Sequence, residues 1–418
     1  MKTHYHIIII GAGPAGLNAA ISAAQSAQSI AIFDDNIFAG GQIWRNGPRA
    51  KLPLIAQKTQ AIVADLPHVD LIQSVKVIAV IQPKILLVEH AGQSLQIHYD
   101  KIIICTGGRE LFLPFPGWTL PGVTGAGALQ ALIKAGLDVK NKKIVISGTG
   151  PLLLASAQTA KKAGAHVIFI AEQTPYKQIK NFAFQLWRWP KKILQAIFMP
   201  IISYHTDSFV IEAQGNHAIQ SVTIHTPKGI KTIDCDYLAC GYGIIANTQV
   251  ASLLGANIKE TVVHVDEMQQ TSLEDIFAAG ECTGFGGSEL SIVEGQIAGY
   301  AAIGDTQRAQ QLFAQRAHDQ KFSHLLKTTF TLRAEVKRLA TSETIFCRCE
   351  DVTLAQVIQH KDWYDTKLQT RCGMGACQGR ICAASATCLF GWDTVKTKVP
   401  LSPIRTKSLI EMLTQQSK

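Results

Sequence analysis

A glycine-rich turn between two apolar segments, in residues 4–34, most constrains how this chain can fold. Residues 7–10 are four consecutive isoleucines, as expected for a parallel strand covered on both faces. A helix of small residues over 15–27 and a strand over 29–33 follow. The turn between the first strand and the helix has the spacing G-x-G-x-x-G, and its glycines are Gly11, Gly13 and Gly16. This order predicts a βαβ unit that binds a dinucleotide, with the pyrophosphate at the helix N-terminus. Asp34, 23 residues after Gly11, ends the second strand and would accept hydrogen bonds from a ribose.

The same pattern recurs 137 residues later, so the chain should contain two dinucleotide-type modules. Gly148 and Gly150 occupy the first two glycine positions, but Leu153 stands at the third, which weakens the expected close approach of helix and strand. Glu172 closes the strand over 166–170 and favours a free 2′-hydroxyl, hence NAD over NADP. Two hypotheses stay open for this second site: it binds NAD(H) or another adenine nucleotide, or it is vestigial.

Composition excludes several classes of protein. With 47% hydrophobic and 17% charged residues among 418, the chain can bury a core and is not disordered. No apolar run is long enough to span a bilayer, and the N-terminal run leads into the glycine turn, so we expect a cytoplasmic protein. The net charge of +9 is local: residues 173–206 hold five Lys and Arg and no acid. No nucleic-acid motif accompanies it, so a nucleic-acid partner is not expected.

Six of the ten cysteines crowd into residues 347–388. Without a secretory signal, this crowding favours a metal centre over a disulfide framework. Four of the six form two close pairs, which are Cys347 with Cys349 and Cys377 with Cys382. Two thiolate pairs suit a [2Fe–2S] cluster, with one pair on each iron. A Cys₄ zinc site is the alternative, although Cys-x-Cys is tighter than the usual zinc spacing. Cys372 and Cys388 exceed the four ligands, and we interpret them as small buried residues.

Two further segments resemble characteristic parts of two-dinucleotide flavoproteins. Residues 271–281 resemble their second FAD motif, in which Gly280 and the following acid, here Glu281 in place of the usual Asp, meet the ribityl chain. Residues 103–108, with Thr106 and Gly107, resemble the crossover between the two nucleotide modules. The resemblance implies FAD at the first site. The chain has no Cys-x-x-Cys, so disulfide reductase activity is not expected.

A more specific resemblance lies in residues 347–353 and 370–382, where the sequence is CRCEDVT and TRCGMGACQGRIC. These segments resemble the FAD/iron–sulfur subunit of heteromeric amine dehydrogenases, a family that includes the opine oxidase A subunit, the hydrogen cyanide synthase B subunit and the α subunit of proline/hydroxyproline dehydrogenases. The cysteine module is similar to bacterioferritin-associated ferredoxin. Residues 113–124 and the segment 40–45, which contains Gly41 and Gln42, match the same family.

The resemblance implies that a partner flavoprotein similar to D-amino-acid oxidase oxidises the C–N bond of an amino acid, opine or proline derivative. This chain would then transfer electrons through FAD and [2Fe–2S] to a respiratory acceptor, and a small ferredoxin-like subunit is a further possible partner. The sequence offers no nucleophile–base constellation, in keeping with flavin-based chemistry. Two alternatives remain, a self-sufficient NADH:acceptor oxidoreductase and a non-catalytic redox scaffold.

The expected fold is therefore α/β, a two-dinucleotide-binding-domain flavoprotein with a small C-terminal [2Fe–2S] domain. We expect an FAD domain at 1–110 and 241–304, an NAD(P)-type domain at 111–240, a helical connector at 305–340 and the cluster domain at 341–418. Within the second module, residues 176–203 are basic and aromatic, with Pro190 between two expected short helices. This stretch either covers the module or docks a partner protein; peripheral contact with the inner face of the cytoplasmic membrane is the weaker alternative.

Overall fold

The computed structural model describes residues 1–48, 51–197, 203–394 and 397–410, and these form two compact units. Unit 1 comprises residues 1–109, 245–324 and the described part of 395–418. Unit 2 comprises residues 110–244 and 325–394. The chain therefore leaves unit 1 after residue 109 and returns to it at residue 245. Residues 305–324 and 397–410 also belong to unit 1.

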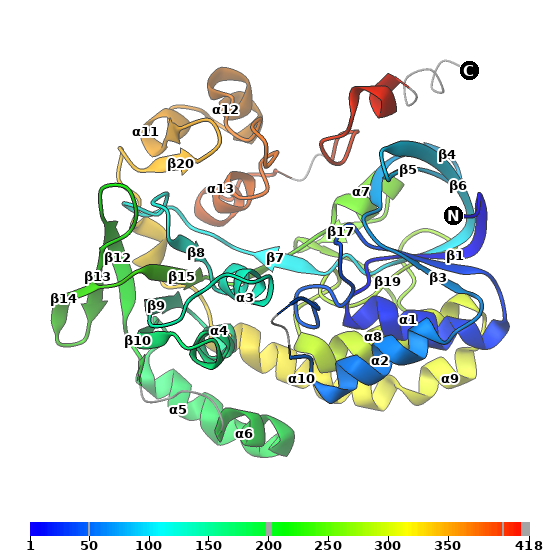
Figure 1. Cartoon of the computed structure of the whole chain (residues 1–418), viewed down its shortest axis with the longest axis horizontal. Coiled ribbons are helices and arrows are strands. Elements are labelled where there is room, and N and C mark those ends of the chain that lie inside the picture. The colour runs from blue at the N-terminus through cyan, green and yellow to red at the C-terminus, as the bar shows by residue number, and fades with distance from the viewer. Residues whose placement is uncertain (49–50, 198–202, 395–396, 411–418) are drawn as a thin grey trace. The chain divides into compact units, whose positions relative to one another are not determined.

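Unit 1 is built on a sheet of strand order β3-β2-β1-β6-β5-β4, with β19 beside β6 (Figure 1). Strands β1, β2, β3 and β19 run parallel to the C-terminal half of β6, whereas β4 and β5 form an antiparallel meander with its N-terminal half. The strands are β1 His4–Ile10, β2 Ile30–Phe33, β3 Val69–Ile72, β4 Lys76–Gln82, β5 Ile85–His90, β6 Gln93–Ile104, β17 Ile258–Lys259, β18 Val262–Val263 and β19 Ile276–Ala278. The helices are α1 Pro14–Ala23, η1 Ala24–Ser26, α2 Leu54–Ala64, α7 Gln249–Leu254, α8 Gly287–Ala302 and α9 Thr306–Gln311.

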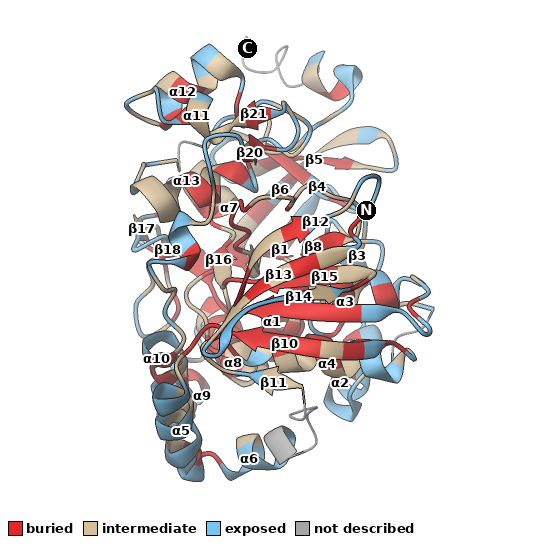
Figure 2. Cartoon of the chain, turned by 90° about the vertical axis from the view of Figure 1, so that its left-hand side faces the viewer, coloured by how far each residue is buried: buried red, intermediate tan, exposed pale blue. Residues whose placement is uncertain are grey.

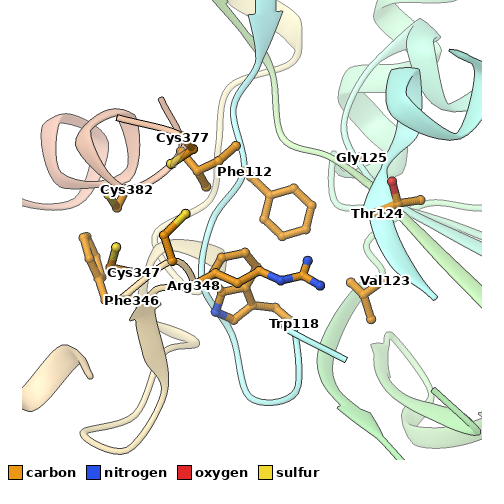
Figure 3. A pocket seen from close by; sticks show the side chains of 12 residues that line it. Phe112, Trp118, Val123, Thr124, Gly125, Phe346, Cys347, Arg348, Cys377 and Cys382 are labelled. Carbon is orange, nitrogen blue, oxygen red and sulfur yellow. The ribbon is translucent and has the colours of Figure 1, made fainter. Parts of the chain in front are cut away.

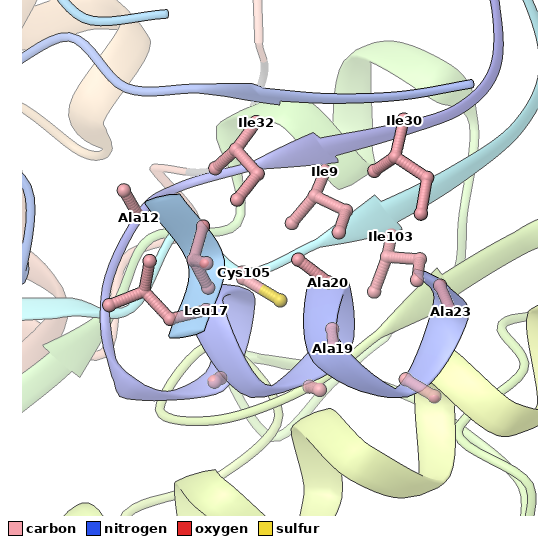
Figure 4. Packing of buried hydrophobic residues seen from close by; sticks show 14 of the residues in the cluster. Ile9, Ala12, Leu17, Ala19, Ala20, Ala23, Ile30, Ile32, Ile103 and Cys105 are labelled. Carbon is pink, nitrogen blue, oxygen red and sulfur yellow. The ribbon is translucent and has the colours of Figure 1, made fainter. Parts of the chain in front are cut away.

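Small residues let α1 pack tightly on the sheet and on α8. Ile7 and Ile9 are fully buried, and Ala19, Ala20 and Ala23 of α1 lie with them in one cluster (Figure 4). Burying each isoleucine contributes roughly 1.5–3 kcal/mol. On the other side of α1, a Cβ at Gly295 of α8 would lie 2.2 Å from the Ala15 carbonyl oxygen. The predicted strand, helix and strand are confirmed.

Unit 2 contains the second parallel sheet, of order β11-β10-β9-β15-β8, and a three-stranded antiparallel sheet, β12-β13-β14. Strand β10 is buried over most of its length (Figure 2). The strands are β8 Val123–Gly125, β9 Lys143–Gly148, β10 His166–Glu172, β11 Tyr204–His205, β12 Phe209–Gln214, β13 Ser221–Thr226, β14 Gly229–Asp234 and β15 Tyr237–Gly241. The helices are α3 Ala126–Lys134, α4 Pro151–Lys162, α5 Tyr176–Gln185, η2 Leu186–Arg188 and α6 Pro190–Ile197. The second βαβ unit is thus confirmed.

The cysteine-rich segment adds a small module to unit 2, with its own core around Phe346, Val357 and Trp363. Its elements are β20 Ile345–Cys347, β21 Val352–Thr353, α11 Leu354–Val357, α12 Trp363–Thr370 and α13 Cys382–Phe390; η3 Val336–Arg338 precedes them. Three elements lie where the chain passes between units: β7 Gly108–Glu110, β16 Ile244–Ala246 and α10 Phe313–Thr329. Beyond the module, Ser408 donates a 2.7 Å hydrogen bond to Glu89 of β5, which explains why the C-terminal residues belong to unit 1.

The basic aromatic stretch forms helices, and Pro190, expected between two of them, is the first residue of α6. Leu186 and Trp189 are buried, whereas Tyr176, Phe184 and Trp187 are 65%, 77% and 64% exposed. The stretch therefore buries part of its side chains and presents other aromatic rings to solvent. Phe198 lies outside the described residues. No helix among the described residues combines the length and apolar character that crossing a membrane requires.

Candidate functional site

The first glycine turn has the geometry that its spacing predicts. A Cβ added at Gly16 would lie 1.9 Å from the Gly11 carbonyl oxygen, so the start of α1 approaches the strand end as only glycine allows. Gly13 is different: its φ is −78°, and an added Cβ would meet only the Cα of Gly41, at 3.9 Å. The backbone at Gly13 therefore faces open space at the N-terminus of α1, where a pyrophosphate fits.

Asp34 joins this turn to the loop that follows β2. Its Oδ2 accepts the N–H of Ala12 at 2.7 Å and its Oδ1 accepts the N–H of Asn36 at 2.8 Å. Arg45 donates a 2.8 Å hydrogen bond to the side chain of Asn36, and its Nε lies 3.4 Å from the carbonyl oxygen of Gly41. The loop that carries Gly41 and the exposed Gln42 is thereby held beside the turn. Arg45 belongs to the segment 40–45 that matched the family, whereas sequence reasoning missed Asn36.

Thr106 and Gly107 are fixed by another residue that sequence reasoning missed. The Thr106 hydroxyl donates to the Asn247 carbonyl at 2.6 Å, and the Asn247 side-chain amide donates to the Thr106 carbonyl at 2.9 Å. The Asn247 N–H completes the set with a 3.0 Å bond to the carbonyl of Gly107. Asn247 lies 141 residues from Thr106, so no local pattern could have revealed the pair.

Two acids after β19 have unequal surroundings. Burial raises the pKa of Glu281, and none of the described residues donates a hydrogen bond to its carboxylate. A desolvated acceptor without a donor suits the ribityl hydroxyls of FAD. Glu294 of α8, which sequence reasoning missed, accepts the N–H of Gly280 at 3.0 Å, and burial raises its pKa to about 7. The residues of unit 1 therefore fit FAD.

The second glycine turn also joins a strand to a helix, but its backbone differs from that of the first, with a φ of +89° at Gly150 against −78° at Gly13, and the turn is more enclosed. Glu172, which burial gives a raised pKa, accepts the N–H of Gly150 at 2.7 Å, as Asp34 accepts that of Ala12. It also accepts the N–H of Thr174 at 2.9 Å and the hydroxyl of Tyr204 at 3.2 Å, and it has no exposed surface. All of these donors belong to the protein, so the carboxylate is already satisfied without a ribose.

A segment remote in sequence lies against this turn. The Phe330 ring carbon Cγ would be 3.6 Å from a Cβ at Gly150, where the predicted pyrophosphate would pass. Gln173 holds the segment by two hydrogen bonds: its side chain donates to the Thr331 carbonyl at 2.8 Å and accepts the Arg333 N–H at 2.9 Å. Leu153 is fully buried and contacts Gly241, whose missing side chain leaves room for it.

Five of the six C-terminal cysteines come together, in an arrangement different from the two sequence pairs. The thiols of Cys347, Cys372 and Cys382 all lie within 4.8 Å of one another. Cys349 instead contacts Cys377. The close pairs therefore join the two motifs, Cys347 with Cys382 and Cys349 with Cys377, and do not follow the Cys-x-Cys and Cys-x₄-Cys spacings. Cys372, expected to be an inert small residue, belongs to the larger group.

Hydrogen bonds stabilise negative charge on one of these sulfurs. The Cys372 and Cys382 thiols and the N–H groups of Gly373 and Glu350 lower the pKa of Cys347 well below its usual range, against the effect of burial, whereas the pKa values of Cys349, Cys372 and Cys382 are raised. A Cβ at Gly375 would lie 2.3 Å from the Cβ of Cys349, so only glycine permits this approach. Such a lining is what thiolate ligands of an iron–sulfur cluster require.

A cavity of about 300 Å³ opens beside the cysteines (Figure 3). Cys347, Cys349, Cys377 and Cys382 line it, and Cys372 does not. The remaining wall comes from Phe346, Arg348 and Ile381 of the cysteine module and from the second nucleotide module, whose members include Phe112, Trp118 and Thr124. Trp118 donates a 2.5 Å hydrogen bond to the Ile345 carbonyl and Ser385 donates a 2.7 Å bond to that of Phe112. The four predicted ligands thus face one space, and their donor set fits a [2Fe–2S] cluster.

Two relatives align with nearly the whole chain. Hydrogen cyanide synthase subunit HcnB of Pseudomonas aeruginosa is 28% identical over 95% of this chain and 96% of its own length. The opine oxidase A subunit of Rhizobium meliloti is 28% identical over 99% of this chain and 88% of its own length. The chain is thus a relative of both, as its cysteine motifs indicated.

Solved structures support the same fold. An L-proline dehydrogenase from P. horikoshii superposes with a TM-score of 0.68 at 17% identity, covering 97% of this chain and 79% of the other. A thioredoxin reductase from T. acidophilum superposes with a TM-score of 0.54 at 21% identity over 76% of this chain. The first covers nearly the entire chain, whereas the second covers about three quarters of it.

The family profile of pyridine nucleotide-disulphide oxidoreductases matches residues 5–312, which include both glycine turns. This family, together with the FAD-type turn in unit 1, identifies a FAD-dependent oxidoreductase subunit related to HcnB and opine oxidase. The chain belongs to the pyridine nucleotide-disulphide oxidoreductase family.

Proposed function

We propose that this chain is the electron-transfer subunit of a heteromeric dehydrogenase or oxidase that acts on the C–N bond of an amino acid, opine or proline derivative. One observation carries the proposal: four thiols face a single cavity in a flavoprotein chain that aligns end to end with subunits of hydrogen cyanide synthase and opine oxidase. The partner that meets the substrate is a flavoprotein similar to D-amino-acid oxidase. A small ferredoxin-like protein is a further partner, and the acceptor is respiratory.

In this proposal the residues of unit 1 hold and orient FAD. Gly13 gives the pyrophosphate access to the N-terminus of α1. The carboxylate of Asp34 accepts a ribose hydroxyl at a lone pair that the N–H groups of Ala12 and Asn36 do not use. Glu281 accepts from the ribityl chain, which supplies the donor that its carboxylate lacks. In unit 2, Cys347, Cys349, Cys377 and Cys382 bind the cluster. A bound FAD supplies two-electron chemistry and a [2Fe–2S] cluster supplies one-electron transfer, so together they connect an amine oxidation to a single-electron acceptor.

The main test is anaerobic spectroscopy of the purified chain. We expect flavin bands, absorbance beyond about 500 nm and equal amounts of iron and acid-labile sulfide, as a [2Fe–2S] cluster requires. Cys377→Ala should lose the iron and keep the flavin, whereas Cys388→Ala, which changes a cysteine outside the group, should keep both. A colourless chain that contains zinc would contradict the cluster.

The electron donor distinguishes this proposal from a self-sufficient NADH oxidoreductase. Phe330 against Gly150, and Glu172 already satisfied by protein donors, support a second site without NADH turnover. We therefore expect NADH to leave the flavin of the isolated chain oxidised, and the partner flavoprotein with its substrate to bleach it. Phe330→Ala should lower the free energy of unfolding by about 2 kcal/mol, because the half-buried ring is lost. Rapid bleaching of the wild-type flavin by NADH would favour the alternative.

The exposed face of α5 and η2 supports a docking site for the partner flavoprotein. Lys180 and Phe184 of α5 and Trp187 of η2 follow one another at intervals of four and three residues, and all three are exposed, as is Lys191 at the start of α6. No acid occurs in residues 173–206, so the surface suits an apolar protein patch that is rimmed by acids.

A double substitution tests this surface. Phe184→Ser/Trp187→Ser should weaken co-purification with the D-amino-acid-oxidase-like partner, whereas Ile230→Ser, at an equally exposed site on β14, should not. Unchanged complex formation, together with loss of binding to anionic vesicles, would assign the surface to a membrane instead.

A further inference from the structure

One thiol of the buried group has no place among the four ligands. A [2Fe–2S] cluster takes two thiolates on each iron, so the pairs Cys347–Cys382 and Cys349–Cys377 suffice. Cys372 nevertheless lies within 4.8 Å of both Cys347 and Cys382, measured between sulfur atoms. The four predicted ligands line the 300 Å³ cavity and Cys372 does not, so its thiol reaches the other sulfurs from outside the space that the cluster would fill.

The backbone fixes the direction of this side chain. Arg371 ends α12 with a φ of +65°, and Gly373 follows Cys372 with a φ of +79°. The N–H of Cys372 donates to the Thr370 hydroxyl at 3.2 Å, and a Cβ at Gly373 would lie 2.6 Å from the Trp363 ring. Cys372 has no exposed surface and packs in the core of the module. The thiol is therefore held in one position, within reach of the Cys347 and Cys382 sulfurs.

We propose that Cys372 is a positioning residue which donates a hydrogen bond from its S–H to the ligand sulfur of Cys347 and so raises the reduction potential of the cluster. A hydrogen bond to a ligand sulfur withdraws electron density and stabilises the reduced, more negative state. The effect falls on one iron, because Cys349 and Cys377 pair apart from Cys372. This inference rests on the cluster of the proposed function.

Three single variants test the inference. Cys372→Ala removes the donor, and Cys372→Ser keeps a donor of similar size. Cys388→Ala is the matched control, since Cys388 is a half-buried cysteine of the same module that neither joins the group nor lines the cavity. For each protein, iron and sulfide are quantified, the dithionite-reduced EPR spectrum is recorded, and the midpoint potential is measured by redox titration.

We expect Cys372→Ala to keep its iron and sulfide, to shift its midpoint potential to a more negative value and to change its EPR g-values. Cys372→Ser should lie between it and the wild type, and Cys388→Ala should match the wild type. Loss of iron from folded Cys372→Ala and Cys372→Ser would make Cys372 a ligand and overturn the inference. An unchanged potential and spectrum in Cys372→Ala would overturn it too, and would leave the proposed function intact. A wild-type chain without iron and sulfide would overturn both.

Discussion

The two glycine turns are both tied to an acid at the end of the second strand, but they differ in backbone conformation and in what lies above the turn. In both, an acid at the end of the second strand accepts a 2.7 Å hydrogen bond from a turn N–H, Asp34 from Ala12 and Glu172 from Gly150. Above the first turn, Gly13 has only Gly41 nearby, whereas Gly150 lies against Phe330. The local sequence thus specifies the turn, and a segment 180 residues away determines whether a nucleotide can reach it.

Restoring the missing glycine of the second turn is the substitution for which we expect the largest change in the free energy of unfolding. Leu153 is fully buried, so Leu153→Gly should lower the free energy of unfolding by about 4 kcal/mol, from lost burial plus the low helix propensity of glycine. Leu152→Gly is the control, because it makes the same change in α4 at a partly exposed position and should cost about 1 kcal/mol. Denaturant unfolding measures both.

Nucleotide binding then tests whether the glycine or Phe330 matters. We expect Leu153→Gly to bind NADH no better than the wild type, because Phe330 still lies against Gly150. If Leu153→Gly keeps its stability and gains NADH binding, the glycine spacing alone determines whether the second turn binds a nucleotide. Phe330 would then not explain the difference between the two turns.

Sequence reasoning succeeded where the signal was local. The two βαβ units follow from runs of isoleucine and glycine spacing, and the gathering of Cys347, Cys349, Cys377 and Cys382 follows from their crowding. It could not find contacts that the tertiary fold creates. The pairing of thiols across motifs and the third thiol of Cys372 depend on how the loop between α12 and α13 folds back on β20.

Buried acids in the two units make the free energy of unfolding depend on pH. Glu172 accepts hydrogen bonds from Gly150, Thr174 and Tyr204, whereas Glu294 in unit 1 accepts from Gly280 and Thr283 and has a pKa raised to about 7. Because the folded state keeps the Glu294 proton that the unfolded state releases, this group costs stability as pH rises from about 4.5 to 7.

Glu294→Gln should remove this loss, which amounts to about 3 kcal/mol between pH 4.5 and pH 8. Unfolding by urea at several pH values measures it as the difference between variant and wild type. Glu274→Gln, a change of an exposed acid in unit 1, should show no such difference. Parallel curves for Glu294→Gln and the wild type would mean that Glu294 is ionised throughout in the folded protein.

Gly13→Ala should have the smallest effect on stability, and it tests most directly whether only the first turn binds a nucleotide. Its φ of −78° suits alanine and an added Cβ would meet nothing nearer than 3.9 Å, so the apoprotein should lose only about 0.5 kcal/mol. A methyl group there would occupy the approach of the pyrophosphate, so FAD retention through gel filtration should fall. Gly150→Ala, at a φ of +89°, should instead cost about 1–2 kcal/mol of backbone strain and leave the flavin content unchanged. If Gly13→Ala retains FAD as the wild type does, the pyrophosphate does not cross the turn at Gly13. The open space beside Gly13 would then not explain why the two modules differ in nucleotide binding.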